Sequence, residues 1–126
     1  MRTKLATINL QVADPQRSRR FYEDVLGMVE DARRSHPPSF VYLRSDGCDL
    51  TLATPPESSG AQPSRTIELG FLVDDIEAMK SHLSARGIRD HREESMGWGR
   101  ALELRDEDGY RIVIYSFERA GGVDRR

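Results

Sequence analysis

The sequence predicts an α+β protein built from two repeated βαβββ modules. Three observations indicate this fold class. Short segments alternate apolar and polar residues, which is typical of strands with one buried face. Two other segments carry helix-start and helix-end signals. The pattern of the first half also returns in the second half at an offset of about 61 residues.

The internal repeat supports the two-module interpretation. Placing residues 6–14 above residues 67–75 aligns apolar side chains at every second position. Further along, residues 50–52 (Leu-Thr-Leu) match residues 112–114 (Ile-Val-Ile), and an Asp-Gly pair precedes each of them. Because several stretches match in the same order, we interpret the two halves as copies of one unit.

Each module should begin with a strand followed by a helix. In the first module a strand over residues 7–12 leads to Asp14, a good N-cap, and Pro15, which suits the first helical position. Gly27 supplies the glycine typical of a helix end. In the second module either Asp74 or Asp75 caps the helix and Gly87 ends it.

Three short strands are expected after each helix, separated by turn signals rich in Gly, Pro and Asp. The predicted strands cover residues 28–31, 39–44 and 48–53 in the first module, and residues 88–91, 101–105 and 111–115 in the second.

We expect a single domain over residues 1–126. Its predicted parts are module one (1–58), a linker (54–65), module two (65–118) and a flexible tail (119–126). The linker is predicted from its prolines, serines and glycine.

Composition argues against several classes of partner. The chain has 19 basic and 21 acidic residues, a net charge of −2, and the two signs are interspersed, so we expect no nucleic-acid binding. No apolar run approaches the roughly 18 residues of a membrane helix, and none resembles a signal peptide. We therefore expect a cytoplasmic protein without a membrane partner. Cys48 is the only cysteine, which excludes an intrachain disulfide.

Several paired motifs resemble a known family. They are residues 10–14 (Leu-Gln-Val-Ala-Asp), Ser18, residues 21–22 (Phe-Tyr), residues 26–28 (Leu-Gly-Met) and residues 106–110 (Asp-Glu-Asp-Gly-Tyr). In a duplicated βαβββ unit these motifs resemble the vicinal oxygen chelate superfamily of glyoxalases, extradiol dioxygenases, fosfomycin-resistance enzymes and bleomycin-resistance proteins. The resemblance implies a cupped, half-barrel mixed sheet whose concave face, the cup, holds a divalent metal and the substrate.

The resemblance also implies four metal-ligand positions, two in each module. Here they fall on Thr7, Thr51, Glu68 and Val113. A threonine hydroxyl is a poor donor for a divalent ion and valine has no lone pair. We therefore expect no metal at this position and no other cofactor, and a divalent metal held by atypical ligands is the alternative.

Strand alternation indicates which side chains line the cup. If Ile8, Leu10 and Val12 pack on the helices, the intervening residues face the cup, and the repeat extends this rule to the second module. The predicted ligand-binding residues are Thr7, Asn9, Gln11, Phe40, Tyr42, Thr51, Glu68, Trp98, Glu103, Arg111, Val113 and Tyr115. Trp98 is placed on a glycine-rich loop over residues 96–99, where it stacks on a planar ligand or, alternatively, packs or contacts a second copy.

Three functions remain open, and enzymatic activity is undecided. The first is a metal-free small-molecule-binding protein of the bleomycin-resistance type that acts as a homodimer. The second is a lyase, isomerase or dioxygenase in which Glu68 acts as the catalytic base or atypical ligands hold a metal. A structural or regulatory protein whose cup is filled by its own side chains is a third hypothesis. In the binding hypothesis, Glu68 either pairs with Arg111 or contacts a cationic ligand.

Overall fold

The computed structural model describes residues 1–56, 63 and 66–117, and the chain divides into two compact units, Met1–Pro63 and Ser64–Arg126. Most of the predicted linker (residues 57–62, 64 and 65) and the whole predicted tail lie outside the described residues. In the described parts neither helix is long and apolar enough to span a membrane.

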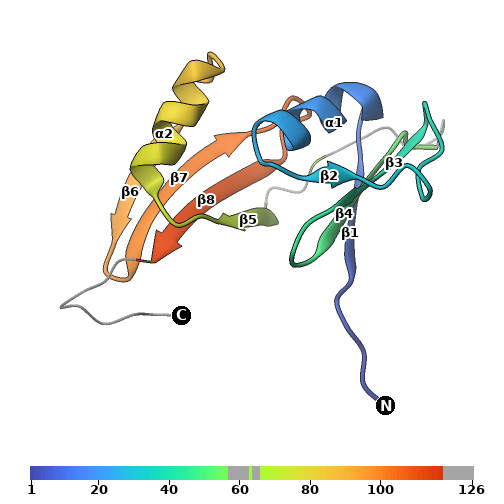
Figure 1. The fold of residues 1–126 in the computed structure, drawn as a ribbon, viewed down its shortest axis with the longest axis horizontal. Coiled ribbons are helices and arrows are strands. Elements are labelled where there is room, and N and C mark those ends of the chain that lie inside the picture. The colour runs from blue at the N-terminus through green and yellow to red at the C-terminus, as the bar shows by residue number, and fades with distance from the viewer. Residues whose placement is uncertain (57–62, 64–65, 118–126) are drawn as a thin grey trace. The chain divides into compact units, whose positions relative to one another are not determined.

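The first unit has the predicted βαβββ order (Figure 1). Its elements are β1 (Thr7–Gln11), α1 (Pro15–Asp24), β2 (Val29–Glu30), β3 (Phe40–Arg44) and β4 (Asp49–Ala53). The strands form one mixed sheet in the order β1-β4-β3-β2, in which β1 and β4 are parallel and the other pairs are antiparallel.

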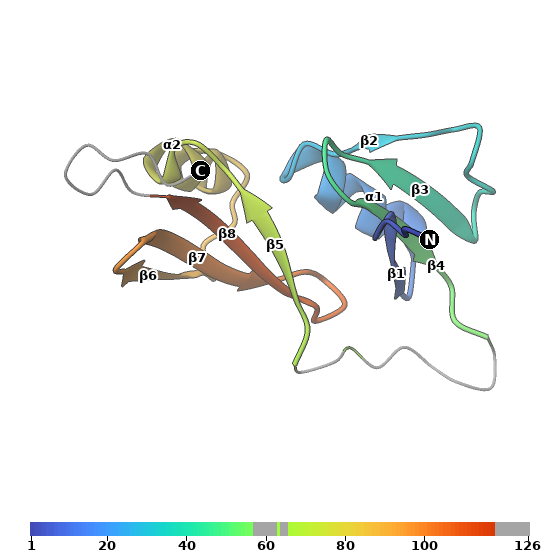
Figure 2. The ribbon, with the colours of Figure 1, turned by 90° about the horizontal axis from the view of Figure 1, so that it is seen from below.

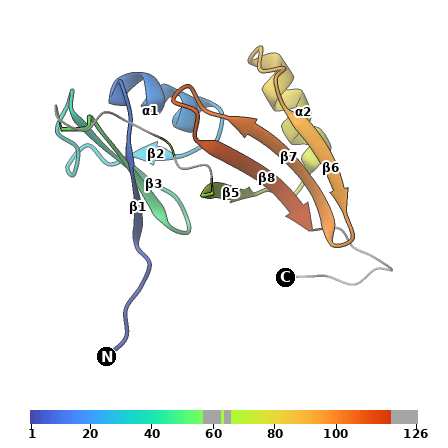
Figure 3. The ribbon, with the colours of Figure 1, turned by 180° about the vertical axis from the view of Figure 1, so that it is seen from behind.

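The second unit repeats this topology, as Figures 2 and 3 show from two further directions. Its elements are β5 (Glu68–Leu72), α2 (Ile76–Ala85), β6 (Arg92–Met96), β7 (Gly99–Arg105) and β8 (Arg111–Phe117). The strand order is β5-β8-β7-β6, with β5 and β8 parallel. The predicted α+β fold with two βαβββ modules is therefore confirmed.

Alternation of burial along the strands explains why each sheet has one helix-covered face. In β4 and β3 the side chains of Leu50, Leu52, Val41 and Leu43 are buried, and Tyr22 of α1 is buried with them. In the second unit the buried side chains are Leu69, Ile76, Leu83, Leu102, Leu104, Ile112 and Ile114. Each unit thus has an apolar core between its helix and one face of its sheet, which leaves the other face available for polar side chains.

Both helices begin and end at the predicted residues. The Asp14 side chain accepts hydrogen bonds from the backbone N–H groups of residues 16 and 17, and Asp75 accepts one from the N–H of Ala78. Asp75, and not Asp74, is therefore the second N-cap. Gly27 and Gly87 both have φ 74°, the left-handed conformation that ends a helix at low steric cost.

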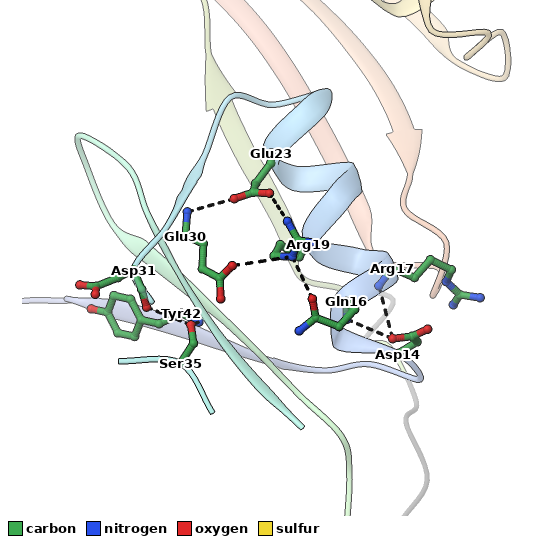
Figure 4. A network of polar contacts seen from close by, with 9 residues as sticks. All are labelled: Asp14, Gln16, Arg17, Arg19, Glu23, Glu30, Asp31, Ser35 and Tyr42. Atoms are coloured by element: carbon green, nitrogen blue, oxygen red, sulfur yellow. Dashed lines mark hydrogen bonds and ion pairs between the residues drawn. The ribbon is translucent and has the colours of Figure 1, made fainter. Parts of the chain in front are cut away.

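Polar contacts tie α1 to the strand that follows it (Figure 4). The carboxylate of Glu23 accepts hydrogen bonds from the Arg19 guanidinium at 2.5 Å and from the backbone N–H of Glu30 at 3.1 Å. Below them, the Ser35 hydroxyl donates to the Asp31 carbonyl at 2.9 Å and accepts from the Tyr42 N–H at 3.0 Å. These contacts fix the connection between β2 and β3.

The structure corrects the predicted strand boundaries of the second module. Residues 88–91 do not form a strand, because the N–H of Ile88 bonds to the Leu83 carbonyl and closes the helix end. The strand at this place is β6, at residues 92–96. Residues 96–99 are also not an open loop: β6 and β7 form a hairpin joined by a two-residue turn, Gly97 and Trp98. β8 extends two residues further than predicted, to Phe117.

Candidate functional site

The face of the second sheet that α2 does not cover carries a cavity of about 720 Å³. Strand alternation brings every second residue of β5, β6, β7 and β8 to this face. The lining residues are Glu68, Gly70, Arg92, Glu94, Met96, Trp98, Ala101, Glu103, Arg111, Val113, Tyr115 and Phe117. We call this the second-unit cavity.

One end of the second-unit cavity is aromatic. The rings of Trp98, Tyr115 and Phe117 contact one another edge to face, with centroids 5.7–5.9 Å apart. Edge-to-face contacts of this kind stabilise aromatic pairs beyond the area that they bury. Trp98 nevertheless remains 41% exposed, so part of its indole surface is accessible from the cavity.

The other end of the second-unit cavity is charged. The Arg111 guanidinium contacts Glu68 of β5 at 2.5 Å and Glu103 of β7 at 3.0 Å. Arg92 of β6 contacts the same Glu103 at 2.9 Å and Glu94 at 3.4 Å. A chain of ion pairs therefore crosses all four strands, with carboxylates and guanidinium groups in alternation.

These ion pairs shift the pKa values of Glu103 and Arg111 so that both groups favour their charged forms. The hydrogen bond from Arg111 lowers the pKa of Glu103 below its ordinary value, and the charges of Arg92 and Arg111 act in the same sense. In return, Glu103 and then Glu68 raise the pKa of Arg111. Glu103 therefore stays ionised and Arg111 stays cationic throughout the physiological pH range.

Small and neutral side chains separate the two ends. Val113 lies between Arg111 and Tyr115 on β8, and it pairs in register with Gly70 of β5 and Glu103 of β7. A Cβ atom added to Gly70 would lie 3.4 Å from Cε1 of Tyr115, so the glycine leaves the tyrosine ring room against the sheet. The part of the cavity lining between the two ends, at Gly70, Ala101 and Val113, is consequently uncharged.

The first unit also collects its predicted residues on one sheet face. Asn9 pairs in register with Thr51, which pairs with Tyr42, so their side chains point the same way. The Thr51 hydroxyl donates to the Asn9 side-chain oxygen at 2.6 Å, and the Tyr42 hydroxyl donates to Asp49 at 2.8 Å. Thr7, Gln11 and Phe40 share this face by the same alternation.

In the first unit, hydrogen bonds stabilise the Asp49 carboxylate beside Tyr42. The backbone N–H of Ser45 and the Tyr42 hydroxyl both donate to Asp49 and lower its pKa. The same hydrogen bond to Asp49 raises the pKa of Tyr42. Arg34 lies over the Tyr42 ring, 5.1 Å from its centroid. This face is therefore polar, with the Asp49 carboxylate held by hydrogen bonds from Ser45 and Tyr42 and with the Arg34 guanidinium against the Tyr42 ring.

The residues at the four family positions do not fit a divalent metal. Thr51 uses its hydroxyl hydrogen for Asn9, and the Glu68 carboxylate contacts Arg111. Val113 has no donor atom, and Thr7 offers only a neutral hydroxyl. Among the residues that the structure describes, no three His, Cys, Asp or Glu side chains gather as a metal centre requires.

The structure brings six of the predicted site residues into one cavity: Trp98, Glu68, Glu103, Arg111, Val113 and Tyr115. Of the six other lining residues, Gly70 and Ala101 follow from the strand alternation already described, and four were missed by the sequence analysis: Arg92, Glu94, Met96 and Phe117. Continuing the alternation of β8 past Tyr115 would have found Phe117. The other three lie on β6, which carries no apolar alternation by which a strand is recognised.

Comparison with known proteins identifies relatives of this fold. The family model described as Glyoxalase/Bleomycin resistance protein/Dioxygenase superfamily matches residues 4–114. A lactoylglutathione lyase structure from Agrobacterium tumefaciens is 20% identical with a TM-score of 0.73, and the match covers 91% of this chain and 94% of that one. No curated protein matches the sequence.

Two further solved structures have the same architecture. A glyoxalase/bleomycin resistance protein/dioxygenase from Nocardioides is 19% identical, with a TM-score of 0.73 and coverage of 100% of this chain and 89% of that one. A putative glyoxalase family protein from Bacillus anthracis is 15% identical, with a TM-score of 0.74 and coverage of 94% and 98%. At these identities the likeness establishes the fold alone.

Proposed function

The chain belongs to the Glyoxalase/Bleomycin resistance protein/Dioxygenase superfamily, and from this membership we propose that it binds a small organic molecule without the help of a metal ion. The bleomycin-resistance type of protein is the model for this function. The ligand occupies the second-unit cavity. The observation that carries the proposal is the combination, in one cavity, of an aromatic end and an ion-paired end.

Cavity size and composition support a ligand of drug-like dimensions. A volume of about 720 Å³ lies within the range of about 300–1,000 Å³ that is usual for ligand pockets. Such pockets combine apolar or aromatic walls with a few polar groups that fix the orientation of the ligand. Trp98, Tyr115 and Phe117 provide the wall, and Glu68, Glu103 and Arg111 provide the polar groups.

Charge in the cavity favours a planar ligand with a cationic group. Three carboxylates, Glu68, Glu94 and Glu103, line the cavity together with two guanidinium groups, Arg92 and Arg111, so the lining carries one net negative charge. Indole and phenol rings also attract cations to their faces, especially when the cation is partly desolvated.

Fluorescence of the only tryptophan in the sequence, Trp98, tests the proposal. We expect the planar cation 9-aminoacridine to quench it saturably, and the planar anion 1-anilinonaphthalene-8-sulfonate to bind more weakly. Tyr115→Leu, which removes an aromatic wall, should weaken quenching. The control is Tyr110→Leu in the turn before β8, outside this cavity. Equal titrations of the Tyr115 and Tyr110 variants would contradict the proposed location.

A second variant tests the role of Glu68. If its carboxylate contacts the cationic group, the charge-assisted hydrogen bond contributes about 1.5–3 kcal/mol, so Glu68→Gln should weaken 9-aminoacridine binding about tenfold to a hundredfold. Unchanged affinity would remove Glu68 from the binding site while leaving the aromatic wall in place. Glu68 is also the base in the enzymatic alternative, which predicts lost turnover with retained affinity in the same variant.

We also propose a homodimer in the cytoplasm. Family membership and the exposed apolar side chains of Leu5, Val29 and Ile67 support self-association. Sedimentation equilibrium should give twice the mass of the chain, and a monomer at micromolar concentration would contradict the dimer.

A further inference from the structure

Arg111 places a positive charge directly between two carboxylates of the second-unit cavity. Its Nη2 atom lies 2.5 Å from Oε2 of Glu68 and 3.0 Å from Oε2 of Glu103. Because both oxygens contact the same nitrogen atom, their separation cannot exceed the sum of these distances, 5.5 Å. Two carboxylates this close repel each other unless a cation lies between them.

The register of the sheet brings these three residues together. Glu68 of β5 is the direct partner of Arg111 of β8, and Glu103 of β7 faces Val113, the next residue of β8 on the same face. Direct and diagonal neighbours on one face of a sheet lie within reach of long side chains. Backbone pairing in the middle of the sheet thus fixes the guanidinium between the two carboxylates.

We propose that Arg111 is a built-in counter-cation: it occupies the place that a divalent ion would otherwise take between Glu68 and Glu103, and it competes with any cationic ligand group that contacts Glu68. It thereby determines the charge selectivity of the cavity. The effect on organic ligands rests on the proposed function, whereas the exclusion of metal ions does not.

Geometry and charge both support exclusion. A divalent ion requires carboxylate oxygens at about 2.0–2.6 Å, a position that the guanidinium nitrogen already fills. Its positive charge also repels any second cation at this distance. Removal of Arg111 would leave two facing carboxylates with no counter-ion between them, which is a minimal site for a hard cation.

Manganese binding tests the proposal directly. In the wild-type protein we expect no selective broadening of the backbone amide NMR signals of Gly70 and Val113 by Mn²⁺. The Mn²⁺ concentration is kept low enough that weak surface sites stay largely empty. In Arg111→Met, Mn²⁺ should broaden these signals selectively and bind at least tenfold more tightly, as measured by the loss of the free Mn²⁺ electron paramagnetic resonance signal.

Arg92→Met is the matched control. It removes one positive charge from the same cavity and one contact from Glu103, but Arg92 pairs with Glu103 and Glu94 and not with Glu68. Its Mn²⁺ affinity should stay close to that of the wild type. Arg111→Lys keeps the charge and should also remain closed to Mn²⁺, while the double variant Arg111→Met with Glu68→Gln should lose the gained site.

Three results would overturn the proposal. These are selective broadening of Gly70 and Val113 by Mn²⁺ in the wild type, an Arg111→Met affinity no higher than that of Arg92→Met, and retention of the gained site in the double variant. Circular dichroism checks that each variant is folded. If Arg111→Met is not, Arg111→Gln replaces it with the same expected gain, and the wild-type experiment tests exclusion without any variant.

The organic probe separates this inference from the proposed function. Arg111→Met should also strengthen 9-aminoacridine binding at least tenfold, because the competing internal cation is gone. Absence of dye binding in every variant, with the manganese result as expected, would contradict the proposed function and leave the exclusion of metal ions supported. Dye binding that Arg111→Met does not change would contradict the role of Arg111 in ligand selectivity.

Discussion

Gly99, the first residue of β7, lies too close to β8 to carry a side chain. A Cβ atom added here would lie 2.0 Å from the Ser116 carbonyl oxygen and 3.1 Å from Cα of Phe117. Both neighbouring atoms belong to the backbone of β8, so a side chain at position 99 would fit only if the strand itself shifted. The absence of a side chain, and not a positive φ, is what this position requires.

Gly99→Ala should therefore destabilise the protein. Overpacking of this kind costs about 1–3 kcal/mol, and we expect a loss of that size in the free energy of unfolding measured by urea denaturation. Gly97→Ala is the control from the same hairpin, because an added Cβ there meets nothing within 4 Å. Equal stability of the two variants would show that β8 yields to the new methyl group.

At the scale of the elements, the two aspartates before α2 have different roles. Asp75 accepts a hydrogen bond from the N–H of Ala78, at 3.1 Å, and so satisfies one of the unpaired donors of the first helical turn. We expect Asp75→Ala to lower the free energy of unfolding by about 0.5–2 kcal/mol, and Asp74→Ala to change it little. Thermal denaturation of the two variants compares them directly. A larger effect at Asp74 would contradict the assignment of the N-cap to Asp75.

An ion-pair network joins α2 to the β6–β7 hairpin. Glu93 of β6 contacts Lys80 of α2 at 2.8 Å and also contacts Arg100 of β7, which reaches Glu77 of α2. The hydrogen bond from Lys80, followed by that from Arg100, lowers the pKa of Glu93. Glu93 in turn raises the pKa of Lys80. The network thus prefers both groups ionised in the folded state.

The sign of these shifts predicts the pH range of the stabilisation. A lowered carboxyl pKa stabilises the fold above its ordinary value of 4.5, and this stabilisation is lost as the pH falls through the folded-state pKa. The raised pKa of Lys80 acts oppositely: its contribution is present below 10.5 and is lost as the pH rises through the folded-state value. The stability advantage of wild type over Glu93→Gln should therefore be largest near neutral pH and shrink at both extremes.

Urea denaturation across this pH range measures the difference. Glu94→Gln is the control, because Glu94 faces the other side of β6 and contacts only the exposed Arg92 at 3.4 Å among the ion pairs of the described residues. A constant difference between wild type and Glu93→Gln from acid to alkaline pH would contradict an electrostatic origin.

For the whole molecule, the sequence was sufficient to predict the order of helices and strands along both units, because most strands have one buried face. Apolar residues at every second position, such as Leu50 and Leu52 or Ile112 and Ile114, are buried and make the strand recognisable in the sequence. The strand β6 was missed because all five of its residues are exposed, and its existence depends on hydrogen bonds to β7. The assignment of Ile88 to a strand was wrong, because this half-buried residue belongs to the helix end and its N–H bonds to the Leu83 carbonyl.

The candidate site was predictable only in part, for a related reason. Alternation correctly placed Glu68, Glu103 and Arg111 on one face, and the pairing of Glu68 with Arg111 was one of two alternatives. Which carboxylates share the guanidinium depends on strand register, since a shift by one residue moves every side chain to the other face. A single sequence does not determine the register of β5 and β7 on β8.

The set of donor atoms offered to a family-type metal concerns the whole chain, because the four family positions are divided between the two units. Thr7 and Thr51 lie in the first unit, and Glu68 and Val113 lie in the second. Metal stabilises a fold only when it binds the folded state more tightly than the unfolded one, which requires deprotonated donors held in place. Two hydroxyls, one carboxylate that contacts Arg111 and a valine do not provide them.

We therefore expect EDTA to leave the melting temperature unchanged. Elemental analysis of the purified protein should find no stoichiometric Zn, Ni, Fe or Mn, and added Mn²⁺ should not raise the melting temperature. Arg111→Met supplies the positive control, since a gained cation site in the folded state must raise the melting temperature when Mn²⁺ is added. A fall of the wild-type melting temperature in EDTA, restored by one particular metal, would show that residues other than Thr7, Thr51, Glu68 and Val113 hold an ion whose binding is coupled to folding.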